Sequence, residues 1–194
     1  MKIYTLLLAV FSFTSCIQEF SFSDFILNMF NKHNAYRALH GFSNITYDDN
    51  LAEIALKQAT SLAEEMRFFY SNSTYKGKNI GENFFYCNSW DGISCLPEYD
   101  VTFFWYKEYY TYCMSTGTFP ENERNFISMM WRDTTSMGCG IYYKRYWDCM
   151  DGYFLVCDYY PGPHPYFGDT TEEIKRNMQD RTGADDDEKN PTPC

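Results

Sequence analysis

The chain has 194 residues, with 16 Lys and Arg against 26 Asp and Glu, for a formal net charge of −10. This length is enough for one domain with a real core and too short for two comfortable ones. The negative charge argues against nucleic acid or an anionic membrane surface as the main partner. The 18 Tyr and 17 Phe support a packed interior and, more weakly, an apolar ligand site.

The first residues have the pattern of a secretory signal. Lys2 precedes an apolar run over 3–13 that is too short to span a bilayer. Cleavage after Cys16 is favoured over cleavage after Ser15, and a buried N-terminal strand is the alternative to a signal. We therefore predict a signal peptide over 1–16 and a secreted, extracellular protein. No later stretch of about 20 apolar residues occurs, so no integral membrane segment is expected.

The cysteine content agrees with export. Without Cys16, seven cysteines remain, six of them in the globular part and Cys194 in the tail. An oxidising compartment favours disulfides, and their pairing is not fixed by sequence. No C-x-x-C pair is present, so a zinc site made of cysteines is not indicated. Two N-x-[ST] sequons, at Asn44 and Asn72, lie in polar surroundings and predict surface glycans.

Three helices are predicted in the first part of the chain. Apolar residues at helical spacing predict the first over 24–39, with Ser23 or Asp24 as its cap. The second follows the capping residues 48–50 and continues to about residue 66. The third covers about 99–112 and includes an acid within an aromatic stripe, which is costly unless the acid is paired or hydrogen-bonded.

Three strands and a fourth helix complete the predicted domain. A strand at 79–87 follows a polar loop at 71–78. The run 125–143 predicts a short buried helix that turns into a β-branched and aromatic strand, and a last strand covers 153–160. With three antiparallel strands, this order predicts an α+β layered domain. The polar, acidic chain beyond it contains one helix near 172–179 at most and is otherwise typical of disorder.

Five short motifs in order resemble the CAP superfamily, also called SCP/TAPS. The likeness covers residues 24–168 and is greatest to the venom-allergen-like proteins of parasitic worms such as schistosomes. It implies a single three-layer α-β-α sandwich with a three-stranded antiparallel sheet, so we predict a CAP domain over 24–168 and an acidic, mostly disordered extension over 169–194. The motifs are His33-Asn34-x-x-Arg37, Gly81-Glu82-Asn83, Trp105-Tyr106-x-Glu108 with Tyr112, Gly138-Cys139-Gly140 and Leu155-Val156-Cys157-x-Tyr159.

The resemblance also implies two specific features. One is a disulfide between Cys139 and Cys157. The other is a central cavity in which many CAP proteins place two histidines and two glutamates around a divalent metal. The glutamates match Glu82 and Glu108. Asn125 occupies the position of the second histidine in the family's signature. The position of the first histidine falls near Ser71.

Two carboxylates without imidazole make a poor zinc site. No metal and no cofactor are therefore predicted, although a hard cation such as Mg²⁺ or Ca²⁺ is an alternative that two acids alone serve weakly. We favour a structural role for Glu82 and Glu108, as acceptors for buried backbone donors or as partners of His33 or Arg37, over a catalytic acid–base pair. No G-x-S-x-G, Walker or H-E-x-x-H motif occurs, and we expect no enzyme activity.

A sterol site is implied by a loop that follows the third helix in CAP proteins. Its aromatic pattern matches Tyr110, Tyr112 and Phe119, the last aromatic coming two residues late. A surface hairpin tethered by Cys113 explains the same loop equally well.

A fatty-acid groove between the first and fourth helices is the second lipid site implied by the family. Methionine is unbranched and polarizable, which suits a flexible acyl chain. Ordinary core packing is the competing explanation for each of these residues. The candidates are Phe25, Ile26, Met29 and Phe30 on one wall and Phe126, Met129 and Met130 on the other.

These patterns together predict a secreted, non-enzymatic protein that binds sterol, and also fatty acid, to sequester or transport it at a host–parasite interface. The alternative is an extracellular immunomodulatory ligand that contacts host proteins. A metal-dependent hydrolase is the least supported class, because the two histidines are missing.

Overall fold

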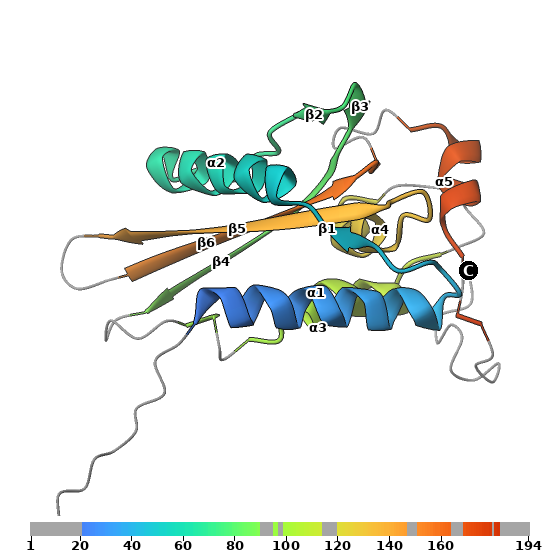
Figure 1. Cartoon of the computed structure of the whole chain (residues 1–194), viewed down its shortest axis with the longest axis horizontal. Coiled ribbons are helices and arrows are strands. Elements are labelled where there is room, and N and C mark those ends of the chain that lie inside the picture. Colours follow the sequence, from blue (N-terminus) through green and yellow to red (C-terminus); the bar gives the residue numbers. More distant parts are fainter. Residues whose placement is uncertain are drawn as a thin grey trace, which may run out of the picture.

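The computed structural model describes residues 21–89, 95–96, 99–113, 120–146, 151–163, 169–179 and 181–182. Its middle layer is a sheet with the strand order β1-β5-β6-β4 (Figure 1). The strands are β1 (Thr46–Tyr47), β4 (Gly81–Ser89), β5 (Ser136–Arg145) and β6 (Asp151–Tyr160). The three long strands are antiparallel, as predicted. The structure adds the two-residue β1, parallel to β5, which is too short to leave a periodic pattern.

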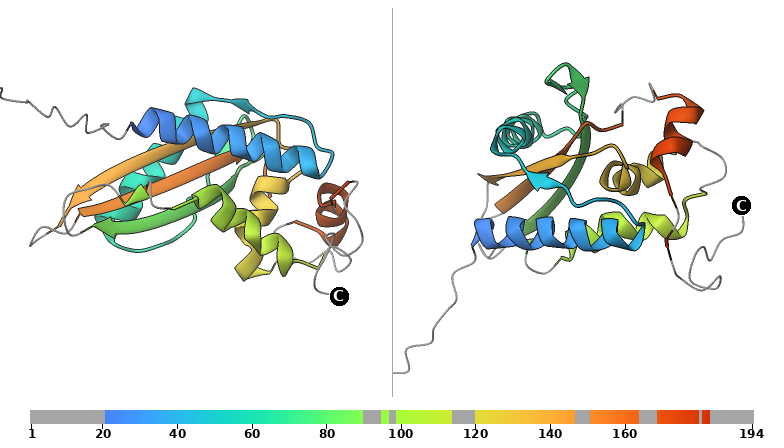
Figure 2. Two further views of the ribbon diagram at one scale, coloured as in Figure 1. Left: turned by 90° about the horizontal axis from the view of Figure 1, so that it is seen from below. Right: turned by 45° about the vertical axis from the view of Figure 1, so that its right-hand side comes forward.

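Helices cover both faces of this sheet, which confirms the α+β sandwich (Figure 2). Helix α2 (Asp49–Glu65) lies on one face, and α1 (Phe22–Leu39) lies on the other. Beside α1 are α3 (Val101–Tyr106), which continues as the 3-10 turn η2 (Lys107–Tyr110), and α4 (Arg124–Met130), which follows the 3-10 turn η3 (Glu121–Glu123). The helix α5 (Thr171–Asn177) packs near the end of β6, within the predicted range for a C-terminal helix.

Local signals account for the helix ends. Helix α1 begins two residues earlier than predicted because Ser21, rather than Ser23 or Asp24, is the N-cap and accepts the Asp24 N–H. Asp48 caps α2 by accepting the Asn50 N–H. The predicted third helix is shorter in its α-helical part, because the chain tightens to a 3-10 turn after Tyr106.

The predicted polar loop at 71–78 is partly structured. It contains a small hairpin made of β2 (Thr74–Tyr75) and β3 (Lys78–Asn79). Gly77 adopts a φ of +75° in the turn, a conformation that L side chains rarely adopt. The sequons in this part of the chain and earlier, Asn72 and Asn44, are both exposed, and their glycosylation stays a prediction.

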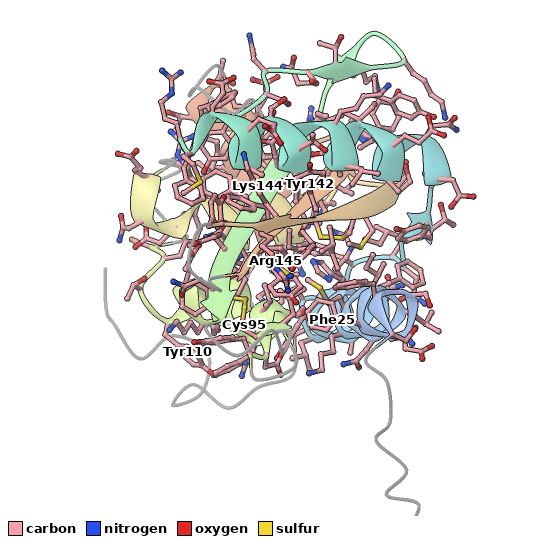
Figure 3. All side chains as sticks on the ribbon, turned by 90° about the vertical axis from the view of Figure 1, so that its left-hand side faces the viewer. Phe25, Cys95, Tyr110, Tyr142, Lys144 and Arg145 are labelled. Carbon is pink, nitrogen blue, oxygen red and sulfur yellow. A yellow bond between two sulfur atoms is a disulfide. The ribbon has the colours of Figure 1, made fainter. Side chains whose placement is uncertain are left out.

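The Gly138-Cys139-Gly140 step is explained by the packing of α2 on β5. A Cβ at Gly138 would collide with the backbone around Leu51 and Ala52, and a Cβ at Gly140 would collide with the backbone of Leu56. Only residues without side chains let the helix approach the strand this closely. Figure 3 shows Tyr142 and Lys144, further along β5, pointing toward α2, where they reach Glu64 and the Ala63 carbonyl.

The sandwich has a large aromatic core on the α1 side and a smaller core of alanines under α2. The predicted disulfide between Cys139 and Cys157 is present and joins directly opposed residues of β5 and β6. Cys87 and Cys95 form a second disulfide, and Cys113 is also disulfide-bonded. Within the described ranges, no helix combines the length and the apolar character that crossing a bilayer requires.

Candidate functional site

The four residues predicted for the CAP cavity form two hydrogen-bonded pairs. Glu82 on β4 accepts the Ser71 backbone N–H at 3.1 Å. Glu108 on η2 accepts the Asn125 side-chain amide at 2.6 Å and the Phe126 backbone N–H at 2.9 Å. Each glutamate is thus engaged by the segment that carries a histidine in the family pattern. The predicted role as acceptors for backbone donors is confirmed, whereas neither His33 nor Arg37 pairs with them.

Burial dominates the electrostatics of these two carboxyls. It raises the pKa of Glu82 to about 7, although the hydrogen bonds from Ser71 lower it. Burial likewise raises the pKa of Glu108 to about 7 against the hydrogen bonds from Asn125 and Phe126. Both groups therefore carry a proton for part of the time near neutral pH.

A third buried acid, Asp158, was missed in the sequence. It lies directly opposite Glu82 in the β4–β6 register, so the two side chains share the α2 face of the sheet. Asp158 is fully buried, and neither of its carboxyl oxygens has a hydrogen-bond partner among the described residues. Burial, together with the charge of Glu82, raises its pKa well above the usual range. The signal was an acid at an inward position of the alternating strand 153–160.

This donor set does not fit the metal that the family pattern implies. Both oxygens of Glu108 already accept hydrogen bonds, and Asn125 turns a donor rather than a ligand atom toward it. Glu82 faces an acid and not an imidazole. Among the described residues, no group of three or more His, Cys, Asp or Glu is arranged to hold a metal ion. The chemistry of these residues is that of proton-sharing carboxyls.

The other buried polar residues of α1 are structural. Arg37 donates hydrogen bonds to five backbone carbonyls, those of Ser43, Met129, Trp131, Arg132 and Thr134. His33 donates from Nδ1 to the Met29 carbonyl at 2.7 Å and accepts from the Tyr159 hydroxyl at 2.8 Å. Burial lowers the pKa of His33 to about 4, so this ring is neutral. Arg37 thereby holds α1 against the end of α4 and the segment that leads into β5.

The described residues of the predicted sterol loop differ in their exposure to solvent. Tyr112 is 1% exposed and packs against Phe126 in the aromatic core, whereas Tyr110 is 37% exposed. Phe119 lies outside the described residues. The sterol loop therefore stays a prediction, with Tyr110 as its described surface residue.

The residues predicted to line a fatty-acid groove between α1 and α4 pack together in the core. Met29, Phe126, Met129 and Met130 are all buried. Phe25, Ile26 and Phe30 are half-buried and pack against the same cluster. Ile26 and Phe30, however, also line a different space.

That space is an apolar groove along the β5 edge of the sheet, which we call the edge groove. One part, a cavity of about 380 Å³, is lined by Ser23, Ile26, Leu27, Phe30 and Tyr47. An adjoining part of about 350 Å³ also contains Ile26, and its other lining residues are Phe22, Asp49, Ala52, Glu53, Leu56, Cys139, Gly140 and Ile141. Sequence analysis placed Ile26 and Phe30 at a lipid site but not α2, because the closeness of α2 to β5 depends on two glycines.

Tyr47 fixes the centre of the edge groove. Its ring packs edge-on against Phe30, with ring centroids 5.9 Å apart. Its hydroxyl donates to the Cys139 carbonyl at 3.1 Å and accepts from the Cys139 N–H at 3.2 Å. These bonds hold the ring across the edge of β5, where β1 ends. The groove therefore has a rigid floor between the two helices.

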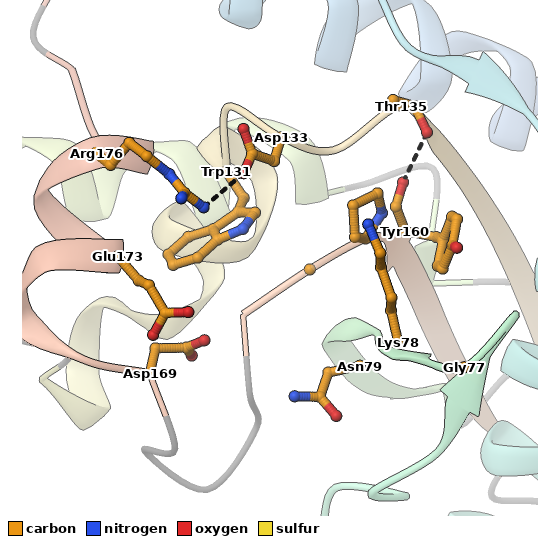
Figure 4. Close-up of a pocket in the computed structure, with 12 residues that line it drawn as sticks. Gly77, Lys78, Asn79, Trp131, Asp133, Thr135, Tyr160, Asp169, Glu173 and Arg176 are labelled. Carbon is orange, nitrogen blue, oxygen red and sulfur yellow. Dashed lines mark hydrogen bonds and ion pairs between the residues drawn. The ribbon is translucent and has the colours of Figure 1, made fainter.

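A larger cavity of about 660 Å³ lies where β6 ends and β5 begins (Figure 4). Charged and polar side chains surround it, among them Lys78, Asp133 and Glu173. Arg176 is bound to Asp133 at 2.8 Å, and Glu173 caps α5 by accepting the Thr170 N–H. Trp131 contributes a ring that is 4% exposed. This lining does not suit an apolar ligand.

Comparisons with known proteins agree on one family. The model of the CAP family, described as the cysteine-rich secretory protein family, matches residues 30–159. Protein PRY2 of Saccharomyces cerevisiae is 30% identical over 119 residues, which are 61% of this chain and 32% of the yeast protein. Pathogenesis-related protein 1C of Nicotiana tabacum is 27% identical over 169 residues, 84% of this chain and 90% of its own length. The matched segment lies within the predicted domain 24–168, whose exact limits stay a prediction.

A solved structure shows the same fold. MpPR-1i has a TM-score of 0.52 at 18% identity, covering 78% of this chain and 100% of its own. Venom allergen-like protein 4 of Schistosoma mansoni also matches, with a TM-score of 0.47 at 18% identity over 76% of this chain and 95% of its own.

Proposed function

Because the chain belongs to the cysteine-rich secretory protein (CAP) family, we propose that it is an extracellular, non-enzymatic lipid-binding protein whose edge groove holds an apolar chain. The observation that carries this proposal is the edge groove itself. The helical faces of α1 and α2 border it, and Tyr47 and the edge of β5 form its floor. Secretion is supported by the N-terminal signal pattern and by the disulfides.

The division of the edge groove into two parts favours an extended single chain over a sterol. The two parts share Ile26, so a chain that passes this residue can occupy both. Each methylene group that leaves water for such a surface contributes about 0.8 kcal/mol when fully buried. A chain that lies in both parts is therefore held mainly by its length. Sterol binding at the loop of Tyr110 and Phe119 stays a separate prediction.

The absence of a catalytic role is part of the proposal. The carboxyls closest to a catalytic arrangement are Glu82 and Glu108, and both are engaged by backbone donors of the chain. A general acid or base needs a substrate within hydrogen-bonding reach, and neither group lines the edge groove.

A second candidate function is contact with a host protein. Three aromatic residues in and just before α3, Tyr99, Phe103 and Phe104, are each between 44% and 47% exposed. Exposed aromatic groups of this kind are enriched at protein interfaces. If this surface carries the function, Phe103→Ser will abolish activity in a host-cell assay without changing lipid binding.

The lipid proposal is tested with a neutral ligand, so that head-group charge plays no part. Dodecanol is offered to the protein by calorimetry or by displacement of the neutral dye Nile red. We expect saturable binding that is lost in Ile26→Asp, because a carboxylate then lies in both parts of the groove. Leu39→Asp is the matched control, since Leu39 is exposed on the same helix outside the groove. Absence of binding to the unmodified protein, or equal loss in both variants, would contradict the proposal.

A further inference from the structure

We propose that the edge groove selects a single-chain amphiphile with a positively charged head group, a long-chain amine, whose ammonium is bound by Asp49 and Glu53. This inference rests on the proposed function, because it assigns a head-group class to the same site. It differs from the prediction of a fatty acid, whose head group carries the opposite charge.

One face of α2 carries both the acidic and the apolar side chains that such a site needs. Asp49, Ala52, Glu53 and Leu56 line the groove at spacings of i, i+3, i+4 and i+7, so they project from the same face of the helix. The acids stand at its N-terminal end, and Leu56 continues it as an apolar surface. The wall is therefore polar at one end and apolar at the other, as an amphiphile requires.

The α1 residues that line the groove carry no charge. Ser23, Leu27 and Phe30 line one part, Phe22 lines the part that contains the acids, and Ile26 lines both. An alkyl chain that passes from one part to the other therefore contacts Ile26. Its head group then lies where Asp49 and Glu53 meet solvent, because both acids are exposed.

Asp49 and Glu53 have no cationic partner within the described ranges. The ion pairs there use other acids: Lys32 with Asp100 at 2.6 Å, Lys144 with Glu64 at 3.2 Å, and Arg176 with Asp133 at 2.8 Å. On the neighbouring turn, Lys76 approaches Asp48, not Asp49. The two groove carboxylates are thus not engaged in the ion pairs of the described residues.

The fold alone does not account for both acids. Asp49 stands in the first turn of α2, where a negative charge favourably meets the helix dipole. Glu53 lies beyond that turn, where the effect has faded. The charge of Asp49 is also felt inside the groove: burial raises the pKa of Tyr47, and Asp49 raises it further against the hydrogen bond to Cys139. Asp49 therefore acts on both parts of the edge groove.

A carboxylate head group would face like charge in this position. The net charge of −10 adds to that repulsion. An ammonium gains two opposite charges and donates hydrogen bonds to them. Because the acids are exposed, the preference is screened by salt.

The test compares three ligands that share the dodecyl chain: dodecylamine, dodecanol and dodecanoate, each below its micellar concentration at neutral pH and low salt. We expect dodecylamine to bind most tightly and dodecanoate most weakly. Their dissociation constants should differ by a factor on the order of ten or more. High salt should draw the three affinities together. In Asp49→Asn/Glu53→Gln the order should collapse, so that dodecylamine, dodecanol and dodecanoate bind this variant with similar affinities.

Glu65→Gln is the matched control, because Glu65 is an exposed acid on the same helix outside the groove. It should keep the full preference for the amine. Three results would overturn the head-group assignment: equal affinities for the three ligands, tighter binding of dodecanoate, or a preference that survives in the double variant. In each case, binding of dodecanol would still support the proposed function. Failure of dodecanol itself to bind would overturn the proposed function and, with it, this inference.

Discussion

The buried polar site and the edge groove both present acidic side chains, but only the buried ones are held by donors of this chain. Glu82 and Glu108 accept hydrogen bonds from Ser71, Asn125 and Phe126. Asp49 and Glu53 lie exposed beside an apolar groove. The difference teaches that the polar residues named by the family motifs serve the fold, whereas residues outside those motifs border the space that a ligand can enter.

Asp158 is an exception among the buried acids. It is buried like Glu82 and Glu108, yet its carboxyl oxygens have no partner in the part of the chain that the structure describes. A buried acid without donors is tolerated when it keeps its proton. Asp158 therefore adds to the pH dependence of stability that Glu82 and Glu108 also cause.

Among substitutions in the buried interior and in the groove, the largest effect on stability is expected at Arg37. Arg37→Met leaves five buried or part-buried carbonyls without their donor and should lower the free energy of unfolding by about 3–5 kcal/mol in urea denaturation. In Arg176→Met, which removes a surface ion pair, the loss should be below about 1 kcal/mol. Dodecanol affinity at low temperature should be unchanged in both. Similar losses in the two variants would show that Arg37 is not a structural centre.

The next effect concerns the close packing between the interior and the groove. Gly140→Ala places a methyl group against the backbone of Leu56 and should cost about 1–3 kcal/mol of stability, because α2 must move away from β5. The same shift should widen the groove and weaken dodecanol binding. Gly77→Ala is the control: its Cβ meets nothing within 4 Å, so only the strain at φ +75° remains, about 1 kcal/mol. A Gly140 variant as stable as the original would refute the packing account.

The buried acids predict a specific pH dependence of stability. Their folded-state pKa values are raised above the unfolded ones, so unfolding releases protons between the usual Glu value of 4.5 and about 7. The stabilising contribution is complete at the acidic end of this window and is lost as pH rises through about 7. Asp158→Asn should flatten this decline and raise the free energy of unfolding above neutral pH by about 1–3 kcal/mol.

Urea denaturation at a series of pH values measures this effect. Asp133→Asn, at an exposed acid in a surface ion pair, serves as the control and should leave the profile of the original protein. A decline in stability from pH 5 to pH 8 that is as steep in Asp158→Asn as in the original would contradict the shared-proton account.

The smallest effect is expected on the groove side. Leu56→Ala removes part of the apolar wall and should weaken dodecanol binding about three- to tenfold, with little effect on folding because Leu56 is 42% exposed. Leu39→Ala, at a similarly exposed leucine on α1, should leave the affinity unchanged. Calorimetry separates the two, and a stronger effect at Leu39 would place the ligand elsewhere.

Much of the fold could be predicted from the sequence, because it follows from local patterns. The apolar spacing of α2 and the alternation in β6 give their type and place. The resemblance supplied the Cys139–Cys157 pair. The two-residue β1 was not predicted, since its pairing with β5 depends on contacts far apart in the sequence.

The candidate site was predicted less completely. The family pattern predicted a common cavity for Glu82, Glu108, Ser71 and Asn125, and the structure joins Glu82 to Ser71 and Glu108 to Asn125. The edge groove was not anticipated: Leu56 and Tyr47 become neighbours of Ile26 only after α2 settles on two glycines of β5. Asp158 was overlooked because one acid in an apolar strand does not reveal what stands opposite it.

The central claim is that an apolar chain lies in the edge groove and not between α1 and α4. It is tested most directly by methyl NMR of the protein with a dodecyl alcohol that carries a nitroxide near the chain end. The account predicts strong broadening of the methyl signals of Ile26, Leu56 and Ile141, which line the groove, while Met129 and Met130 stay sharp. Broadening of Met129 and Met130 with sharp signals at Leu56 and Ile141 would contradict it.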